Sequence, residues 1–389
     1  MEQDRYGIYV HIPFCSQFCI YCDFYSVKRV SGKGLFLDSL KKEILNVEDN
    51  RDKIGDNIDK RGVGTIYFGG GTPSVLTSGQ LIELLCLIKS SYRSTPGGIE
   101  EVTVEVNPDD ITLEYLKELR KGGFNRLSIG VQSFDDSCLK WMNRRHNGEE
   151  AVKAFCYGRE AGFDNISIDL IFGYAMLPDT LWEGTVKKAI SLSPDHISAY
   201  QMGIEEGTPL YKLALNGGYC APEDEVASGQ YALLQRMLSD AGYLQYEVSN
   251  FSGLGKESRH NSSYWNFTPY LGFGPSAHSF SGACRSWNCS SVKGYIDAIN
   301  AGKSPLGGSE VLGEEEIFCE FIMLSLRTAR GIDKRQMQSR FSRLLTEKFY
   351  ASVEDQKERG NLVEDDNYIK IPPEKLFVSD GIIRSIYWE

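Results

Sequence analysis

No stretch of this sequence comes near the ~18–20 unbroken apolar residues of a membrane-spanning helix, so no span is expected. The first twenty residues also lack the basic and apolar segments of a secretory signal, and we therefore expect a cytoplasmic protein. Basic residues are too few for a nucleic-acid-binding surface, because 42 Lys and Arg face 53 Asp and Glu, a net charge of −11. Internal repeats and low-complexity tracts are missing as well.

The composition is otherwise that of a globular protein. Hydrophobic residues make up 41% and charged residues 24% of the 389-residue chain, which is long enough for one barrel-sized domain and a smaller one. Ten cysteines without a secretory signal indicate a reducing compartment, where thiols bind metals rather than form disulfides. The spacing of these cysteines is therefore informative.

Three of the ten cysteines lie within eight residues, in Cys15-Ser-Gln-Phe-Cys19-Ile-Tyr-Cys22. The apolar segment 7–12 before them is typical of a strand that ends at Pro13, so we expect the thiols on a loop leaving a strand. Three thiols are one short of the four that structural zinc and most [4Fe–4S] clusters take. A cluster held by three thiolates would leave one iron open to a small molecule.

Two alternatives to an open-iron cluster remain at this point. Asp23 or His11 could complete a four-coordinate zinc site with the three thiols. The spacing could also arise by chance among cysteines that have no metal. The residues that follow the other predicted strands bear on this choice.

Predicted strands and helices alternate over the first two hundred residues. Apolar, β-prone runs predict the strands, and leucine and isoleucine at helical spacing predict the helices. We expect strands at 65–68, 102–106, 126–131, 165–171 and 196–200 after the first, and helices that include 35–48 and 149–161. This α/β alternation implies a parallel sheet. Polar residues after nearly every strand favour a partial (β/α)6 barrel around one pocket over a doubly wound open sheet.

We expect three parts along the chain. A barrel core occupies residues 1–205, a barrel-closing segment 206–312 and a small C-terminal domain 313–389. The last part contains helices followed by a hairpin over 362–371 that turns at Asp366-Asn367. Helices followed by a small β-wing indicate an α+β, winged-helix-like module.

Several residues at the strand ends are candidates for binding a ligand. Gly69, Gly70 and Gly71 would expose backbone groups to it, although they could also form only a tight turn. The run is neither a P-loop nor GxGxxG. Glu105 and Asp169 lie in otherwise apolar strands, where a carboxylate costs free energy unless it is paired with an amine or hydroxyl.

Gln132 and Arg144 could reach a carboxylate or a sugar of the same ligand. For each of these polar residues the alternative is a structural hydrogen bond. Taken together with the cysteines, however, they form a specific pattern.

The CxxxCxxC triad, the Gly-Gly-Gly-Thr-Pro turn and the polar strand ends resemble the radical S-adenosylmethionine (SAM) superfamily. Longer motifs resemble its HemN-like group, which contains oxygen-independent coproporphyrinogen III oxidases and the heme chaperone HemW. These motifs are Tyr9-Val-His-Ile-Pro-Phe-Cys15, Phe68-Gly-Gly-Gly-Thr-Pro73, Glu105-Val-Asn-Pro108, Ser128-Ile-Gly-Val-Gln-Ser133 and Asp169-Leu-Ile-Phe-Gly173. The resemblance covers nearly the whole chain and implies a radical SAM partial barrel with a HemN-like C-terminal domain.

The resemblance also implies the cofactors. A [4Fe–4S] cluster would be held by Cys15, Cys19 and Cys22, and SAM would chelate the fourth iron through its amine and carboxylate. By position, the SAM-contacting residues would be Tyr9, Tyr21, Gly70, Gly71, Thr72, Glu105, Gln132, Arg144 and Asp169. No catalytic residue is assigned beyond these.

Three features favour the HemW branch. The cysteine motif of the oxidases resembles CxxxCxxCxC, with a further cysteine two residues after the triad. In this chain Phe24 occupies that position. They also carry an extended N-terminal arm, whereas 14 residues precede Cys15 here. Finally, the HemW branch has a His-Asn-x-x-Tyr-Trp motif, present as His260-Asn261-Ser-Ser-Tyr264-Trp265.

The HemW branch implies binding of heme and its delivery to respiratory hemoproteins. Delivery to an acceptor in the membrane would require transient docking at that membrane. It also implies an electron donor, and a homodimer is one option. His260, Asn261, Tyr264 and Trp265 are then the heme candidates, with His278 as a second candidate for the iron ligand, since imidazole ligates heme iron and aromatic rings stack on it. A packed segment without a ligand is the alternative. The alternative functions are an oxygen-independent coproporphyrinogen III oxidase or another radical SAM enzyme of tetrapyrroles, so enzymatic activity stays undecided.

Overall fold

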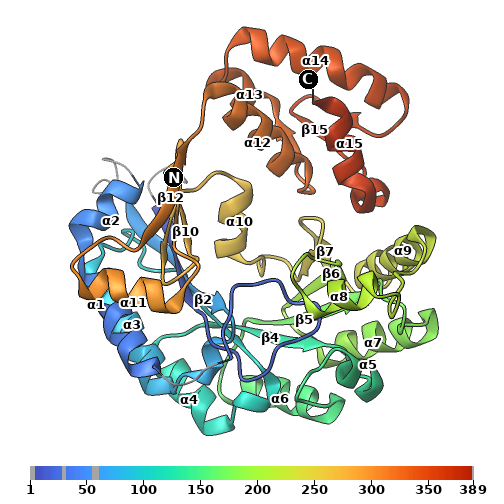
Figure 1. The fold of residues 1–389 in the computed structure, drawn as a ribbon. Coiled ribbons are helices and arrows are strands. Elements are labelled where there is room, and N and C mark those ends of the chain that lie inside the picture. Colours follow the sequence, from blue (N-terminus) through green and yellow to red (C-terminus); the bar gives the residue numbers. More distant parts are fainter. Residues whose placement is uncertain (1–4, 29–31, 55–60, 388–389) are drawn as a thin grey trace.

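The computed structural model describes residues 5–28, 32–54 and 61–387, and the structural statements below concern these residues. Six parallel strands follow one another in chain order across the main sheet, as predicted, and helices cover its outer face (Figure 1). They are β1 (Arg5–Ile12), β2 (Gly62–Gly70), β3 (Glu101–Val106), β4 (Arg126–Gln132), β5 (Ile166–Phe172) and β6 (His196–Gln201).

The helices between these strands are α1 (Lys33–Leu45), α2 (Val47–Ile54), α3 (Ser78–Ser91), α4 (Leu113–Gly122), α5 (Asp136–Trp141), α6 (Gly148–Glu160) and α7 (Asp179–Leu192). Short 3-10 turns follow β2 (η3, Pro73–Val75) and β3 (η4, Pro108–Asp110). Local signals fix where some helices begin. In α6, for example, Asn147 and Glu150 form a reciprocal capping box at the N-terminus.

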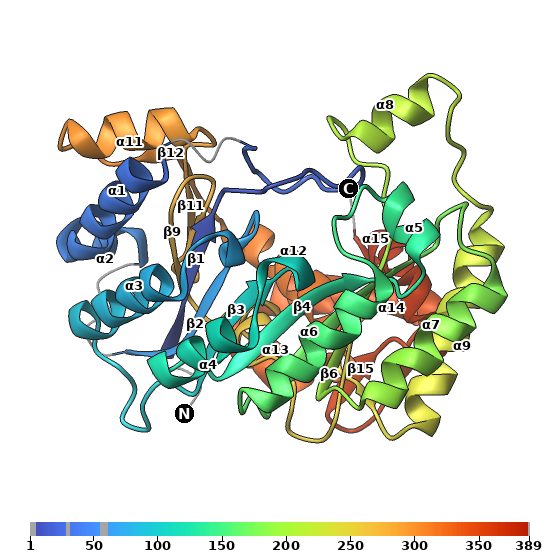
Figure 2. The same ribbon diagram turned by 90° about the horizontal axis from the view of Figure 1, so that it is seen from below.

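Side-chain alternation separates the core from the interior of the barrel. In β4, Leu127, Ile129 and Val131 are fully buried in the apolar core. This core lies between the sheet and the helices along its outside, which Figure 2 shows. The intervening residues Arg126 and Ser128 face the opposite side, since successive residues of a strand point to opposite faces. The sheet thus buries one face under helices and turns a polar face inward.

Further strands extend both edges of the six-stranded part. β9 (Tyr270–Phe273) pairs parallel with β1, and β10 (His278–Phe280), β11 (Cys284–Asn288) and β12 (Leu306–Val311) continue antiparallel from it. On the other side, β8 (Asn250–Ser252) and β7 (Leu244–Gln245) follow β6. In the described residues the two edges of this twelve-stranded sheet do not pair, which confirms a partial rather than a closed barrel.

The remaining helices of the middle segment are α8 (Pro209–Leu215), α9 (Asp224–Asp240), α10 (Arg259–Trp265) and α11 (Val292–Asn300). The His-Asn-x-x-Tyr-Trp motif forms α10 itself, and Ser258 caps this helix by accepting from Asn261 N. In Figure 1, α10 lies between the sheet and the C-terminal domain. The motif is therefore at an internal position of the molecule.

A buried ion pair ties α1, α2 and the added strands together. Glu43 Oε1 accepts from Lys53 Nζ at 3.0 Å and from Asn288 Nδ2 at 2.7 Å. Glu43 Oε2 accepts from Tyr295 OH at 2.6 Å and from Gly274 N at 2.8 Å. The Lys53 and Glu43 side chains are 7% and 2% exposed, so the charges depend on these partners rather than on water.

The C-terminal domain contains α12 (Glu314–Leu326), β13 (Ile332–Asp333), α13 (Lys334–Arg340), α14 (Arg343–Glu358), β14 (Val363–Glu364), β15 (Tyr368–Lys370), η5 (Pro373–Val378) and α15 (Ser379–Ile386). Its three short strands are antiparallel, in the order β13-β15-β14, as a winged-helix-like module requires. β14 and β15 form the hairpin predicted over 362–371. The boundaries drawn after 205 and 312 stay predictions.

None of the helices in the described part of the chain is both long and apolar enough to cross a membrane.

Candidate cofactor site

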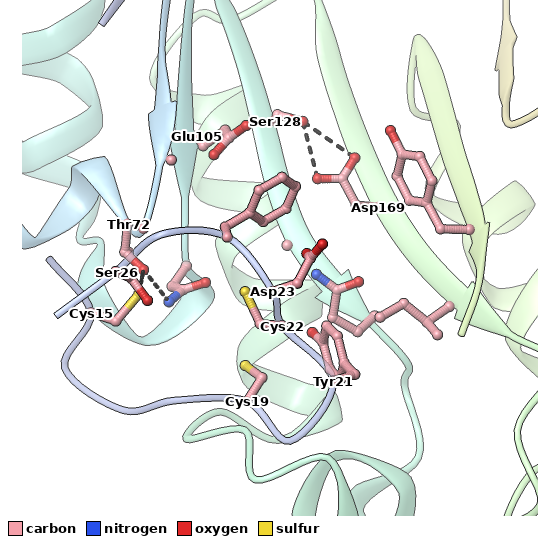
Figure 3. A pocket seen from close by; sticks show the side chains of 18 of the residues that line it. Cys15, Cys19, Tyr21, Cys22, Asp23, Ser26, Thr72, Glu105, Ser128 and Asp169 are labelled. Carbon is pink, nitrogen blue, oxygen red and sulfur yellow. Dashed lines mark hydrogen bonds between the residues drawn. The ribbon is translucent and has the colours of Figure 1, made fainter. Parts of the chain in front are cut away.

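A cavity of about 390 Å³ opens at the carboxyl ends of the parallel strands. Cys15, Cys19 and Cys22 line it from the loop after β1 (Figure 3). Nine further residues predicted from the sequence line the same cavity: Tyr21, Gly70, Gly71, Thr72, Glu105, Gln132, Arg144, Asp169 and Asn261. Four other predicted residues lie outside this cavity. Tyr9, Tyr264 and Trp265 line two neighbouring hollows, and His260 is buried and lines none of them.

The chain's own hydrogen bonds hold the cysteine loop in place. Cys15 N donates to Val27 O at 3.1 Å and Val27 N to Pro13 O at 2.7 Å, which joins the two ends of the loop. At the far side of the loop, Ile20 N donates to Met142 O at 3.2 Å. The thiols are therefore presented by a closed, anchored loop, as the strand-to-loop pattern predicted.

The three thiols fit an iron–sulfur cluster better than a single ion. Within the described residues, no three or more His, Cys, Asp or Glu side chains converge as one metal ion requires. In a [4Fe–4S] cluster each thiolate binds a different iron, so the sulfur atoms need not converge. The zinc alternative also loses His11, whose Nε2 lies 2.9 Å from Tyr25 O. Burial raises the pKa of Cys22 to about 12, so a cluster must displace a proton there.

The turn after β2 presents backbone to the cavity. Gly70 has a φ of +107°, in the left-handed region that glycine enters without strain. A Cβ on Gly70 would lie 2.6 Å from the His11 ring, and one on Gly71 would lie 2.8 Å from Phe14 O. Glycine is thus required at both positions, and the exposed backbone beside the cysteines fits the polar amino-acid end of SAM.

Two half-buried carboxyl groups face the cavity from β3 and β5. Glu105 Oε1 accepts from Tyr67 OH at 2.7 Å. Asp169 accepts from Ser128 Oγ at 3.1 and 3.3 Å (Figure 3). Burial raises the pKa of Glu105 to about 7 and also raises the pKa of Asp169. An amine or ribose hydroxyl would supply the charge or hydrogen bond that these carboxylates lack.

Gln132 reaches the cavity through an irregular backbone. It ends β4 with a φ of +63°, uncommon for a residue other than glycine. The pairing of β4 with β5 shifts register between Ile129 and Gln132, a local bulge of the kind found beside active sites. Backbone strain at this strand end is consistent with a functional position.

Arg144 joins the cysteine loop to the strand ends. Its Nη1 lies 3.4 Å from Cys19 Sγ, and its Nη2 donates to Asn107 Oδ1 at 2.9 Å and to Gly130 O at 2.6 Å. Its buried Nε has no hydrogen-bond partner within the described residues. The guanidinium thus places a positive charge beside Cys19 Sγ and ties the cysteine loop to the ends of β3 and β4.

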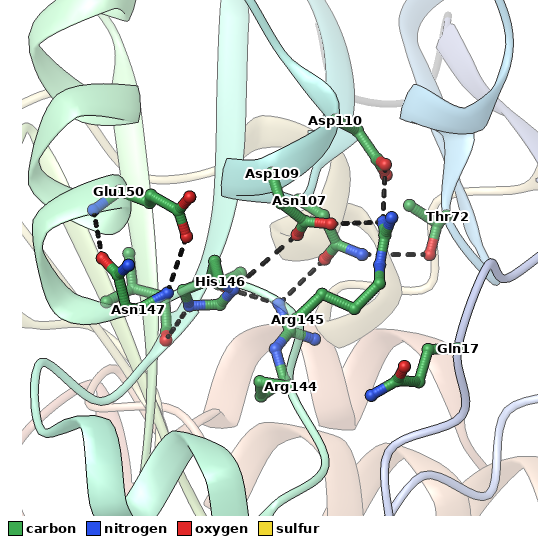
Figure 4. A network of polar contacts seen from close by, with 12 residues as sticks. Gln17, Thr72, Asn107, Asp109, Asp110, Arg144, Arg145, His146, Asn147 and Glu150 are labelled. Carbon is green, nitrogen blue, oxygen red and sulfur yellow. Dashed lines mark hydrogen bonds and ion pairs between the residues drawn. The ribbon is translucent and has the colours of Figure 1, made fainter.

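The residues after Arg144 fix its backbone (Figure 4). Arg145 Nη2 lies 2.5 Å from both Asp109 and Asp110, and His146 Nε2 lies 3.1 Å from Val131 O. Burial lowers the pKa of His146 to about 3, so its imidazole is neutral at physiological pH. This network connects the α5–α6 segment to η4 and β4.

Sequence reasoning missed several polar residues of the cavity. Strand alternation could have found two of them, since Arg126 and Ser128 share a face with Gln132. Arg126 is 1% exposed, and its Nε and Nη1 have no partner within the described residues. The missed polar residues are Gln17, Ser26, Tyr67, Asn107, Arg126, Ser128, Ser198, Tyr200, Gln201 and Glu205.

A second hollow of about 350 Å³ lies beside the first cavity. Asp23 and Phe24 line both, so the segment after Cys22 forms a shared wall. The hollow is otherwise mainly aromatic, and its remaining lining residues are Tyr9, His11, Tyr25, Tyr264, Tyr270, Ser276 and His278. Partial burial, with a contribution from Arg285, lowers the pKa of His278, so its imidazole is neutral at physiological pH.

A third hollow of about 430 Å³ separates the sheet from the C-terminal domain. Asn261, Tyr264 and Trp265 line it from α10, and the C-terminal domain contributes Arg327 and Phe377 among others. Three of the four expected heme residues of the motif therefore line this hollow, and Asn261 also lines the first cavity and Tyr264 the second, whereas His260 lines none of the three.

Two family models match the chain: the radical SAM superfamily over residues 9–189 and the HemN C-terminal domain over residues 312–378. The heme chaperone HemW of Bacillus subtilis is 35% identical over 90% of this chain and 91% of its own. That of Mycobacterium tuberculosis is 33% identical over 85% of this chain and 84% of its own. The chain belongs to the HemW family. The resemblance inferred from the motifs is thereby confirmed.

Among solved structures, coproporphyrinogen III oxidase (HemN) from Escherichia coli, a radical SAM enzyme, has a TM-score of 0.83. It is 22% identical, and the match covers 99% of this chain and 91% of that chain. At this identity the likeness concerns the fold. Membership of the radical SAM superfamily brings a [4Fe–4S] cluster and SAM, and the three thiols, the glycine turn and the half-buried carboxyl groups fit both.

Proposed function

We propose that this chain is a heme chaperone that binds heme and delivers it to hemoproteins, and that it holds a [4Fe–4S] cluster and SAM. The observation that carries the proposal is the likeness to two heme chaperones at 33–35% identity over at least 84% of each chain. Phe24, at the place where an oxidase of the group has a further cysteine, supports the same reading.

In this proposal the cavity binds the cofactors and a neighbouring hollow binds the cargo. Cys15, Cys19 and Cys22 hold three irons, and the backbone at Gly70 and Gly71 receives the amino-acid end of SAM. When bound, the cluster can supply one electron to the sulfonium of SAM. The chain's own contribution is to position these groups and to exclude water with a mostly buried wall.

We further propose that the acceptors are respiratory hemoproteins, reached in the cytoplasm or by transient docking at a membrane. An electron donor completes the cycle, and a homodimer remains an option. The net charge of −11 makes nucleic acid an unsuitable partner.

Anaerobic reconstitution with iron and sulfide tests the proposal. The loaded protein is incubated with SAM and reductant and with either ferric heme or coproporphyrinogen III. We expect stoichiometric heme binding by absorbance, transfer of heme to an apo-hemoprotein, and an unchanged coproporphyrinogen mass. Loss of two carboxyl groups from coproporphyrinogen III would instead make the chain an oxidase, and a changed heme mass would make it an enzyme acting on heme.

Cysteine variants provide the matched control for the cluster. The triple change of Cys15, Cys19 and Cys22 to alanine should abolish the iron–sulfur absorbance. Cys156→Ala should leave it intact, because Cys156 is exposed on α6 and lines none of the three hollows. Equal loss in both variants would contradict the assignment of the cluster.

A further inference from the structure

The histidine expected from the sequence to bind heme is poorly placed for that role. His260 is 1% exposed, with Nδ1 2.8 Å from Thr65 Oγ1 and Nε2 3.0 Å from Tyr264 OH. Its ring also stacks on Tyr67 at a centroid distance of 5.1 Å. A ring nitrogen needs a free lone pair to ligate iron, so His260 would have to break a hydrogen bond and leave a packed position.

Three of the other four histidines are similarly engaged. His11, His146 and His196 are each at most 5% exposed. Each has at least one ring nitrogen within hydrogen-bond distance of another residue, and His11 and His196 have both. All five histidines of the chain lie in the described residues.

His278 differs from all of them. It begins β10 with an exposed side chain, and its ring nitrogens have no hydrogen bond to any other described residue. Its ring stacks on Trp287, the residue opposite it on β11, at a centroid distance of 5.9 Å and an angle of 29°. Stacking therefore orients the imidazole while both nitrogens stay available.

The space beside His278 suits a flat aromatic ligand. Tyr9, Tyr25, Tyr264, Tyr270 and Phe24 supply aromatic rings around the hollow of about 350 Å³. This volume is within the ~300–1,000 Å³ of ligand pockets, and aromatic rings are suited to stacking on a macrocycle. The hollow is also open enough to leave part of a large ligand in solvent.

We propose that the heme cargo binds in the hollow beside His278, with the His278 imidazole as an axial ligand of the iron. This inference rests on the proposed function, because it names the site at which the cargo is held. It also gives His260 a positioning role: its hydrogen bond to the Tyr264 hydroxyl holds Tyr264 in the wall of the hollow. Heme bound there would lie against Phe24, two residues after the last cysteine of the cluster loop.

The test is a titration of the cluster-loaded chain with ferric heme, followed by absorbance and electron paramagnetic resonance. Wild type should show a histidine-ligated spectrum. His278→Ala should lose that spectrum and bind heme about tenfold or more weakly, and added imidazole should restore the spectrum. The exposed variant Lys293→Ala on α11 serves as the matched control, with the spectrum of wild type.

Metal-free protoporphyrin separates ligation from the shape of the hollow. Its affinity, measured by fluorescence, should be the same for wild type and His278→Ala, because it has no iron to ligate. His260→Asn should weaken the binding of both porphyrins while the histidine-ligated spectrum persists.

Three outcomes are distinguishable. If wild type binds heme and His278→Ala keeps the same spectrum and affinity, the site is wrong while the proposed function stands. If wild type binds no heme at all, the proposed function fails. Loss of the spectrum in His260→Asn but not in His278→Ala would assign the ligand to the buried histidine instead.

Discussion

Glu105→Gln should stabilise the cofactor-free chain at pH 8 and leave its stability almost unchanged at pH 4.5 or below. The Glu105 side chain is half-buried in the wall of the cavity, and burial raises the pKa of its carboxyl group from about 4.5 to about 7. A rise of this size corresponds to about 3 kcal/mol of differential stability between the two protonation states. Glutamine keeps the shape and an oxygen that accepts from Tyr67 OH, but it never carries the charge.

The sign follows from proton binding. Between pH 4.5 and 7 the native carboxyl stays protonated while the unfolded one ionises, so this group's stabilisation is present below pH 4.5 and is lost as pH rises through 7. The free energy of unfolding of the variant minus that of wild type should therefore climb from near zero to about 3 kcal/mol across this window. The difference curve also removes the contribution of Glu247, whose pKa burial raises to about 7 as well.

Urea unfolding under anaerobic, reducing conditions at pH 5 and pH 8 measures the effect. Glu83→Gln is the matched control, since Glu83 is exposed in a surface pair with Lys41, and its effect should stay within about 0.5 kcal/mol at both pH values. A difference for Glu105→Gln that does not change with pH, or that falls between pH 5 and pH 8, would refute the reasoning.

Binding of SAM to the wild-type chain should be favoured at high pH, whereas the contribution of Glu105 to folding stability is favoured at low pH. If the ionised Glu105 contacts the ligand, wild-type affinity falls about tenfold per pH unit below 7, and Glu105→Gln has weak affinity with no such slope, as anaerobic calorimetry can measure. Lys53→Ala should lower the free energy of unfolding measured in urea by about 3–5 kcal/mol, because it leaves the buried Glu43 carboxylate without its cationic partner. Lys293→Ala, at an exposed ion pair, should lower it by less than about 0.5 kcal/mol. Arg144→Lys should keep the iron–sulfur absorbance but weaken SAM about tenfold or more, because lysine cannot reproduce its three contacts.

Local patterns predicted the barrel because its strands are short apolar runs at regular spacing. The strand over 126–131 and the hairpin over 362–371 appear within two residues of their predicted bounds. The strands that extend the sheet beyond the six of the barrel were not predicted. Those from 244 to 311 are two to six residues long, and their pairing depends on contacts far apart in sequence, such as that of β9 with β1.

The cofactor cavity was largely predictable for a related reason. Its residues belong to strand ends, and parallel strands bring their carboxyl ends to one edge, so spacing along the chain indicates proximity in space. Tyr9 shows the limit of this reasoning. It lies on the first strand near the cluster loop, but its hydroxyl contacts His11 Nδ1 at 3.1 Å and its ring lines the second hollow.

The heme residues could not be placed from sequence because α10 divides its side chains among different neighbours. Because a helix turns about 100° per residue, the four named residues of the motif spread over about 140° of its surface, and three of them, Asn261, Tyr264 and Trp265, line the third hollow. His260 points into the core, Asn261 toward the cofactor cavity, and Trp265 toward the C-terminal domain. The motif therefore identifies the helix that borders the cavity and both neighbouring hollows. The iron ligand must be sought among side chains of these cavities that make no hydrogen bond within the described residues. By that criterion His278, on a strand with no motif of its own, is the better candidate than the histidine that the motif contains.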